Sequence, residues 1–92
     1  MTELNWTRKA LSDLVRLHEF LGTVDPRAAA RAVQSLAAAS DRLLQYPRLG
    51  EQLEEFVPRE VRRILVGAYE IRYESRDSTI FVLRLWHTRE DR

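Results

Sequence analysis

The sequence of 92 residues contains no cysteine and only three glycines and three prolines. Without cysteine the chain has no disulfide framework, no thiol nucleophile and no thiolate metal site. It also lacks any apolar run near the roughly 20 residues that cross a bilayer, and its first residues lack the pattern of a signal peptide. We therefore expect a cytoplasmic protein that spans no membrane and carries neither metal nor cofactor.

Acidic and basic residues are nearly balanced, with 14 of the former, 15 of the latter and a net charge of +1. Such a balance does not indicate general nucleic-acid binding. Lysine is almost missing, because Lys9 is the one basic residue that is not an arginine. Since the planar guanidinium suits carboxylates, phosphates and aromatic faces, the arginines are the first candidates for contact with a partner.

The first half of the chain predicts two helices joined by a short link. Thr7 is a suitable N-cap for residues 8–21, in which apolar side chains recur at three- and four-residue steps. Gly22 ends this helix, and Asp25 with the proline after it starts a second helix over residues 26–45. Alanines on the inner side of the second helix allow the pair to approach closely, as an antiparallel hairpin.

The second half changes to a period of two. A proline and a glycine within residues 46–50 break the helix, and an acidic loop follows to about Pro58, which we expect to be a solvated connection. Short turns then separate three strands, and a further extended segment precedes the first helix; these strands span residues 4–6, 61–66, 69–75 and 79–87.

These elements predict one domain over residues 1–92, since a shorter piece could not bury enough surface to stay folded. The fold class is α+β, with the order β-α-α-β-β-β. The helical hairpin packs on one face of a small antiparallel sheet. No helix remains to cover the other face, which is therefore left for a partner.

Alternation along the last two strands predicts which side chains share that open face. Phe81, Leu83 and Leu85 form an all-apolar set that belongs under the helices. The alternate residues then lie on the opposite side, where apolar side chains among arginines are typical of a binding patch. The predicted patch consists of Arg72, Ile80, Val82, Arg84 and Trp86.

Few residues could perform chemistry. His87 is the most interesting titratable group, although a single histidine is more often structural. RNA cleavage would need a base, an acid and cations at the scissile phosphate. A glutamate of the acidic loop, His87 and several arginines could supply them; those arginines are Arg62, Arg63, Arg72, Arg84 and Arg89. No Gly-rich phosphate loop, Ser/His/Asp arrangement or metal-ligand spacing occurs.

Several short motifs together resemble the RelE/ParE superfamily of bacterial type II toxins, and they follow one another in the same order over nearly the whole chain. They are Trp6-Thr7, Asp25-Pro26, Tyr46-Pro47-Arg48-Leu49-Gly50, Val61-Arg62-Arg63, the segment from Gly67 to Tyr73, and Leu83-Arg84-Leu85-Trp86-His87. The resemblance implies a toxin neutralised by a cognate antitoxin, whose C-terminal segment wraps the toxin and fills its groove. The predicted patch is then the antitoxin-binding surface. No sequence-specific DNA binding is expected without the antitoxin.

The superfamily divides by target. RelE-like members cleave messenger RNA on the ribosome, whereas ParE-like members poison DNA gyrase without cutting nucleic acid. RelE-like members usually carry lysines on or near the sheet, or a Glu-Arg-His set with a tyrosine near the C-terminus. Here the predicted sheet has no lysine and Thr88 follows His87, so the resemblance favours gyrase and no catalytic residues. The alternative is a nuclease using Arg63, Arg72 and His87. Target contacts are expected at Arg62, Arg63, His87 and Arg89.

Overall fold

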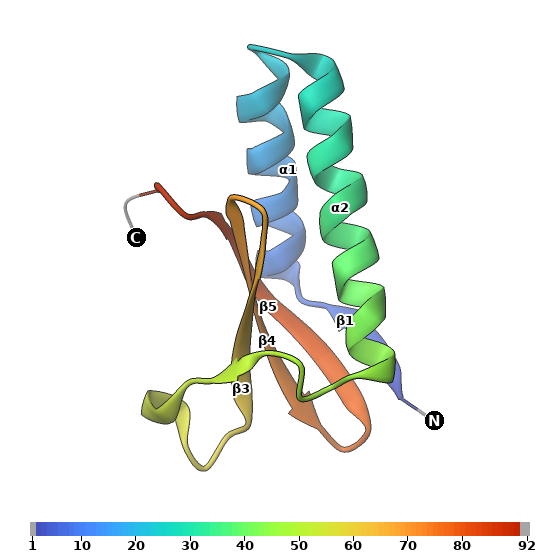
Figure 1. The fold of residues 1–92 in the computed structure, drawn as a ribbon, viewed down its shortest axis with the longest axis vertical. Helices are drawn as coiled ribbons and strands as arrows, with labels where there is room; N and C mark the ends of the chain where they lie inside the picture. The colour runs from blue at the N-terminus through green and yellow to red at the C-terminus, as the bar shows by residue number, and fades with distance from the viewer. Residues whose placement is uncertain (1, 91–92) are drawn as a thin grey trace.

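The computed structural model describes residues 2–90 (Figure 1). The predicted order of strands and helices is confirmed, and two short elements, β2 and η1, add to it within the acidic loop. The elements are β1 (Glu3–Trp6), α1 (Arg8–Gly22), α2 (Pro26–Gln45), β2 (Glu51–Gln52), the 3₁₀ helix η1 (Glu54–Phe56), β3 (Val61–Val66), β4 (Tyr69–Arg76) and β5 (Thr79–His87). Within residues 2–90, neither helix is long and apolar enough to cross a membrane.

Both helices begin at the predicted caps. The Thr7 hydroxyl accepts a hydrogen bond from the backbone N–H of Ala10 at 3.1 Å and donates one to the carbonyl of Val82 at 2.8 Å. Asp25 accepts from the backbone N–H of Arg27 at 3.0 Å. Such caps satisfy N–H groups that have no partner within the helix. Thr7 therefore starts α1 and fastens it to β5 at the same point.

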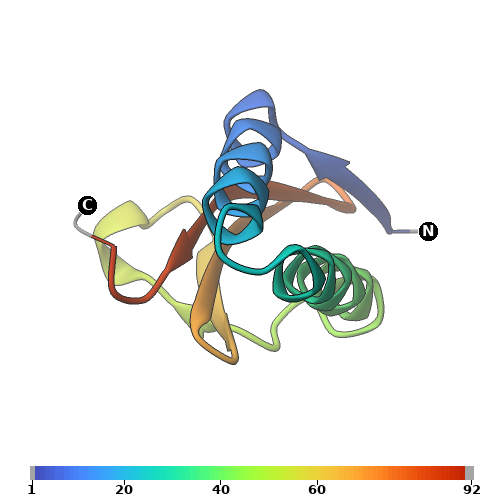
Figure 2. The ribbon, with the colours of Figure 1, turned by 90° about the horizontal axis from the view of Figure 1, so that it is seen from above.

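The sheet has five strands in the order β1-β5-β4-β3-β2. The β3–β4 and β4–β5 pairs are antiparallel, as predicted, and the additional β2 also pairs antiparallel with β3, whereas β1 pairs parallel with β5. The sheet is therefore mixed and not wholly antiparallel, because the edge strand β1 runs in the same direction as its neighbour β5. The two helices cover one face of it, and η1 lies on the other side of the sheet from α2 (Figure 2).

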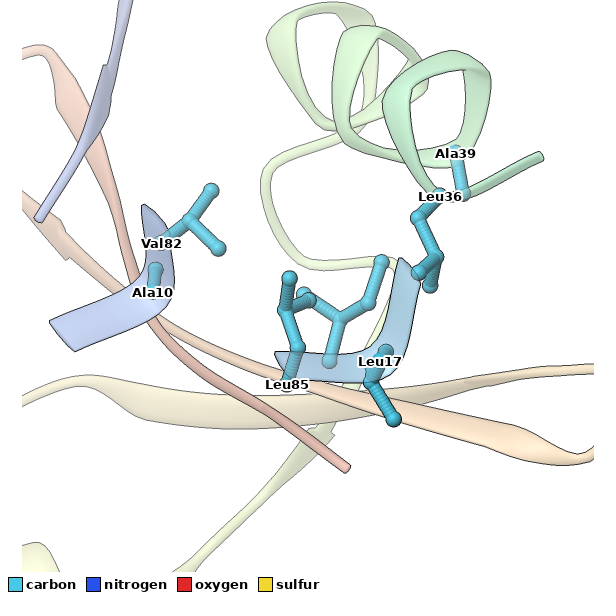
Figure 3. Packing of buried hydrophobic residues seen from close by; sticks show 7 residues of the cluster. Ala10, Leu17, Leu36, Ala39, Val82 and Leu85 are labelled. Carbon is cyan, nitrogen blue, oxygen red and sulfur yellow. The ribbon is translucent and has the colours of Figure 1, made fainter. Parts of the chain in front are cut away.

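The core lies between this face and the helical hairpin. Leu17, Leu36 and Leu85 are among its buried residues, and the small side chains of Ala10 and Ala39 let both helices approach the sheet (Figure 3). Burial of one leucine side chain contributes about 1.5–3 kcal/mol to the free energy of folding. This packing is what fixes the position of the strands.

Tyr73 anchors the end of the sheet that lies near residues 46–50, the segment that follows α2. Its hydroxyl donates to the carbonyl of Pro47 at 2.8 Å and accepts from the N–H of Gly50 at 2.9 Å. A Cβ atom on Gly50 would lie 2.6 Å from the carbonyl oxygen of Arg63. Glycine is therefore required here by close packing against β3, whereas the helix itself already ends at Gln45.

One part of the predicted face assignment is wrong, because β5 contains a bulge. Arg72 pairs with Arg84 and the next residue of β4, Tyr73, pairs with Val82, so Leu83 is an extra residue in β5. An extra residue reverses the alternation beyond it. Ile80 and Val82 are consequently fully buried toward the helices and do not belong to the outer face.

The predicted faces remain correct for the part of β5 that follows the bulge. Leu85 pairs with Ile71 in the core, and Arg84 lies on the outer face opposite Arg72, as expected. The predicted position of Phe81 is also wrong, in the opposite sense. Phe81 pairs with Glu74 on the outer face, whereas the alternation had placed it under the helices.

The acidic loop is also not the solvated connection that the composition predicts. Leu53 is buried, and the N–H of Leu53 donates to the carbonyl of Val61 at 2.8 Å. The ring of Phe56 lies 5.5 Å from the guanidinium carbon of Arg72, and Arg59 forms a bidentate pair with Glu74 at 3.1 and 2.8 Å. Residues 53–60 thus fold over part of the outer face.

Candidate partner-binding face

Three arginines lie side by side on the outer face, one on each of three neighbouring strands. Arg63 of β3 pairs with Arg72 of β4, which pairs with Arg84 of β5. We call this set the arginine row. Like charges directly opposite each other in a sheet are destabilising, so other groups must hold the row together.

Aromatic rings provide part of that support. The guanidinium carbons of Arg72 and Arg84 lie 4.7 and 5.0 Å from the Trp86 ring centroid, and Arg72 also faces Phe56. Cations are attracted to the faces of aromatic rings at such distances. The prediction that Arg72, Arg84 and Trp86 share a face is therefore confirmed, but Trp86 is only 8% exposed.

Carboxylates supply the rest of the support at Arg63 and Arg84. Arg63 donates from Nε to Glu51 at 3.0 Å and lies 3.6 Å from the buried Glu70. Arg84 donates to Asp13 of α1 at 2.7 and 3.2 Å. These two guanidiniums are therefore already partly engaged within the chain.

Arg72 differs from its two neighbours. Its ion-pair contact with Glu70 is 3.6 Å long, its side chain makes no hydrogen bond within residues 2–90, and its buried Nε atom has no acceptor there. The arginine is held by the rings of Phe56 and Trp86, and a guanidinium carries five N–H donors. Arg72 thus has the most hydrogen-bonding capacity left for a partner within the row.

Asp13 is the residue that sequence reasoning missed. β1 ends at Trp6, so within residues 2–90 the edge of β5 beyond Val82 has no neighbouring strand. Asp13 accepts from the N–H of Leu85 at 2.9 Å, and Arg16 donates to the Leu85 carbonyl at 3.1 Å. Side chains of α1 therefore replace the missing strand.

The charge on Asp13 is stabilised where it lies. The side chain is almost fully buried, and this desolvation on its own raises the pKa of the carboxyl. Hydrogen bonds from Arg84, the Leu85 N–H and Arg16 act in the opposite direction and hold the pKa below its ordinary value. The sequence feature that could have revealed Asp13 is its position on the buried stripe of α1, one turn from Ala10 and from Leu17.

The proposed nuclease residues are not brought together. His87 pairs with Tyr69 on the helix side of the sheet, and their rings meet edge to face with centroids 5.3 Å apart. It lines a pocket with residues of α1. Arg63 and Arg72 point from the opposite face, so the sheet separates them from His87.

The four residues predicted to contact a target do not form one patch either. Arg62 is 14% exposed and donates to the carbonyl of Gly50 at 2.8 Å, on the helix side of β3. Arg63 lies on the outer face, His87 on the helix side, and Arg89 beyond the end of β5, where it is exposed. Among the residues described, no cluster of His, Asp and Glu could hold a metal ion.

The helical hairpin on a mixed sheet agrees with the resemblance to RelE/ParE superfamily toxins, and comparison with known proteins shows this class. Residues 4–92 match the model for the ParE toxin of the type II toxin–antitoxin system parDE. The chain belongs to this family.

Individual relatives come from two bacteria. Toxin RelE2 of Caulobacter vibrioides is 34% identical over 87 residues, covering 95% of this chain and 96% of the relative. Toxin RelE1 of the same species is 39% identical over 88 residues, covering 91% and 90%. A solved structure described as the chromosomal ParDE TA system from P. aeruginosa superposes with a TM-score of 0.79 at 27% identity, covering 95% of this chain and 96% of that one.

Proposed function

We propose that this type II toxin arrests growth by binding DNA gyrase and that it does not cleave RNA. The match to the ParE toxin model supports the first part of the proposal, and the separation of His87 from Arg63 and Arg72 by the sheet supports the second. A general acid must lie within hydrogen-bond reach of the reacting group, while the cations must contact the same phosphate. Side chains on opposite faces point away from each other and cannot meet at one phosphate.

The environment of the sheet arginines also favours binding over catalysis. Arg84 is engaged by Asp13, and Arg63 by Glu51 and Glu70. His87 accepts a hydrogen bond at Nδ1 from the backbone N–H of Arg89 at 3.1 Å, an interaction within its own turn. These contacts hold the groups in fixed positions that suit recognition of a partner.

The antitoxin is the second partner, and the outer face is its proposed seat. Arg72, Arg84 and Trp86 remain from the predicted patch, whereas Ile80 and Val82 belong to the core. The free donors of Arg72 suit carboxylates, because guanidinium–carboxylate pairs form charge-assisted, often bidentate hydrogen bonds. We therefore expect an acidic segment of the antitoxin to lie along the arginine row.

The two target hypotheses give opposite results with one purified protein. Incubation with gyrase and plasmid is expected to accumulate cleaved complexes or to block supercoiling, and added antitoxin is expected to reverse the effect. In a translation reaction on a defined message, the RNA is expected to remain intact. Cuts in the ribosomal A site that disappear in His87→Gln, together with unaffected gyrase, would overturn the proposal in favour of the nuclease.

A further inference from the structure

A pocket lies on the helix side of the sheet, where the helical hairpin extends beyond the strands. Figure 1 shows the connected ends of α1 and α2 reaching past the end of the sheet. Beneath this overhang is a cavity of about 310 Å³ between α1 and the last residues of β5. We call it the overhang pocket, and it is lined by Arg16, Leu17, Phe20, Leu21, Tyr69, His87, Arg89 and Glu90.

Its walls suit an apolar side chain. Leu17, Leu21 and the rings of Tyr69 and His87 line it, and Phe20 is 71% exposed beside it. A cavity of roughly 150 Å³ lined by apolar groups can bind benzene, so the overhang pocket has room for an aromatic or branched side chain. Such an occupant would remove Phe20 from water, which is the usual driving force for apolar association.

Among the charged side chains that line the pocket, the one without an ion-pair partner within residues 2–90 is positive. Arg16 is paired with Asp13 and Glu90, and Glu90 also accepts from the N–H of His87 at 2.9 Å. Arg89 is exposed and its guanidinium makes no ion pair within the residues described.

A second basic group lies next to the pocket. Tyr69 also borders a neighbouring hollow that is lined by Arg31 of α2. Arg31 is exposed and likewise has no ion-pair partner in the part of the chain that the structure describes. Arg89 therefore lines the overhang pocket itself, and Arg31 lines the hollow that shares Tyr69 with it.

We propose that the overhang pocket binds an apolar side chain of the antitoxin, from a segment whose flanking acidic residues pair with Arg89 and Arg31. Apolar anchors in pockets with a charged rim are typical of protein interfaces. The proposal rests on the proposed antitoxin partnership and extends it. The arginine row and the overhang pocket lie on opposite faces, so one antitoxin chain would hold the sheet from both sides.

The test measures binding of the purified toxin to the product of the reading frame adjacent to its gene, by titration calorimetry. Phe20→Asp is expected to weaken the complex about tenfold or more, because it puts a charge at the apolar wall. Arg89→Glu is expected to weaken it about fivefold, by repulsion of an acidic segment. The matched controls are Val15→Asp and Lys9→Glu, exposed positions of α1 that do not line the pocket.

The outcomes separate this inference from the function on which it rests. Unchanged affinity in both Phe20→Asp and Arg89→Glu, with wild-type binding intact, would overturn the inference alone. A wild-type toxin that does not bind the neighbouring product would overturn the antitoxin partnership and the inference with it. Losses in the two control variants equal to those in the pocket variants would also contradict a localised anchor. Circular dichroism of each variant verifies that the fold is retained.

Discussion

The two faces of the sheet are built by different forces. The helix side is apolar and is held by close packing of buried side chains, among them Ile71, Leu85 and Leu36. The outer side is charged and is held by rings and carboxylates around the arginine row. Removing atoms from the first should cost stability, while changing charges on the second should alter recognition more than folding.

The largest expected effect is in the core. Leu36→Ala should lower the free energy of unfolding by roughly 2–5 kcal/mol, because it leaves a cavity at a fully buried site. Leu65→Ala is the control, since Leu65 is 64% exposed on β3, and its effect should stay within about 0.5 kcal/mol. Denaturant titration measures both. Equal losses would show that the outer side contributes to the core and would break the comparison.

The next effect concerns Asp13, which joins the two sides. Asp13→Asn should lower the free energy of unfolding by roughly 1–3 kcal/mol, since an amide cannot serve the Leu85 N–H and two guanidiniums as a carboxylate does. Asp41→Asn on the exposed side of α2 is the matched control and should be nearly neutral. A neutral result at both positions would remove Asp13 as the replacement for a neighbouring strand.

A smaller effect is expected at the arginine row. Arg72→Glu should weaken binding of the antitoxin about tenfold. It should also lower thermal stability, because it removes the contacts with the Phe56 and Trp86 rings and places a carboxylate beside the buried Glu70. Arg76→Glu, an exposed charge reversal at the far end of β4, should weaken it much less. Calorimetric titration together with a melting curve separates recognition from folding. Equal losses at both positions would indicate attraction by net charge only.

The smallest effect is expected from acid. The pKa of Asp13 in the folded protein lies below its ordinary value of 3.8, and Arg59 lowers that of Glu74 below 4.5. A depressed carboxyl pKa contributes stability above the unfolded pKa, and that contribution is lost as the pH falls through the folded pKa. Unfolding free energy should therefore change little from pH 7 to 5 and decrease below about pH 4. Asp13→Asn should flatten this decrease, and Asp41→Asn should not.

β4 and β5 show how far the sequence predicts the fold. In β4, Tyr69, Ile71 and Tyr73 face the helices as regular alternation requires. In β5 the same reasoning fails before Leu83, because the composition of a strand does not reveal which residue is left unpaired. Prediction of the bulge needed the pairing partners of β4, which are set by tertiary structure.

The candidate site was predictable to a similar degree. Arg72, Arg84 and Trp86 follow from their spacing, but the cover provided by Phe56 comes from a loop whose acidic composition indicated only solvent. Asp13 was hidden because a charged residue on an apolar stripe is recognised as a partner only when the edge it serves is known. His87 was a candidate by residue type, and only the register places it away from the arginines.

The bulge at Leu83 has a consequence for how this surface can change over evolution. Core residues and outer-face residues alternate along β5 in two registers, and the extra residue marks the point at which one register changes to the other. Moving this point by one position would exchange a core side chain for a surface one with no change in amino-acid composition. Deletion of Leu83 would instead remove the extra residue and restore regular alternation, with Val82 and Leu85 both still on the core side. The strand can therefore tolerate the loss of its bulged residue more readily than a shift of the bulge along the strand.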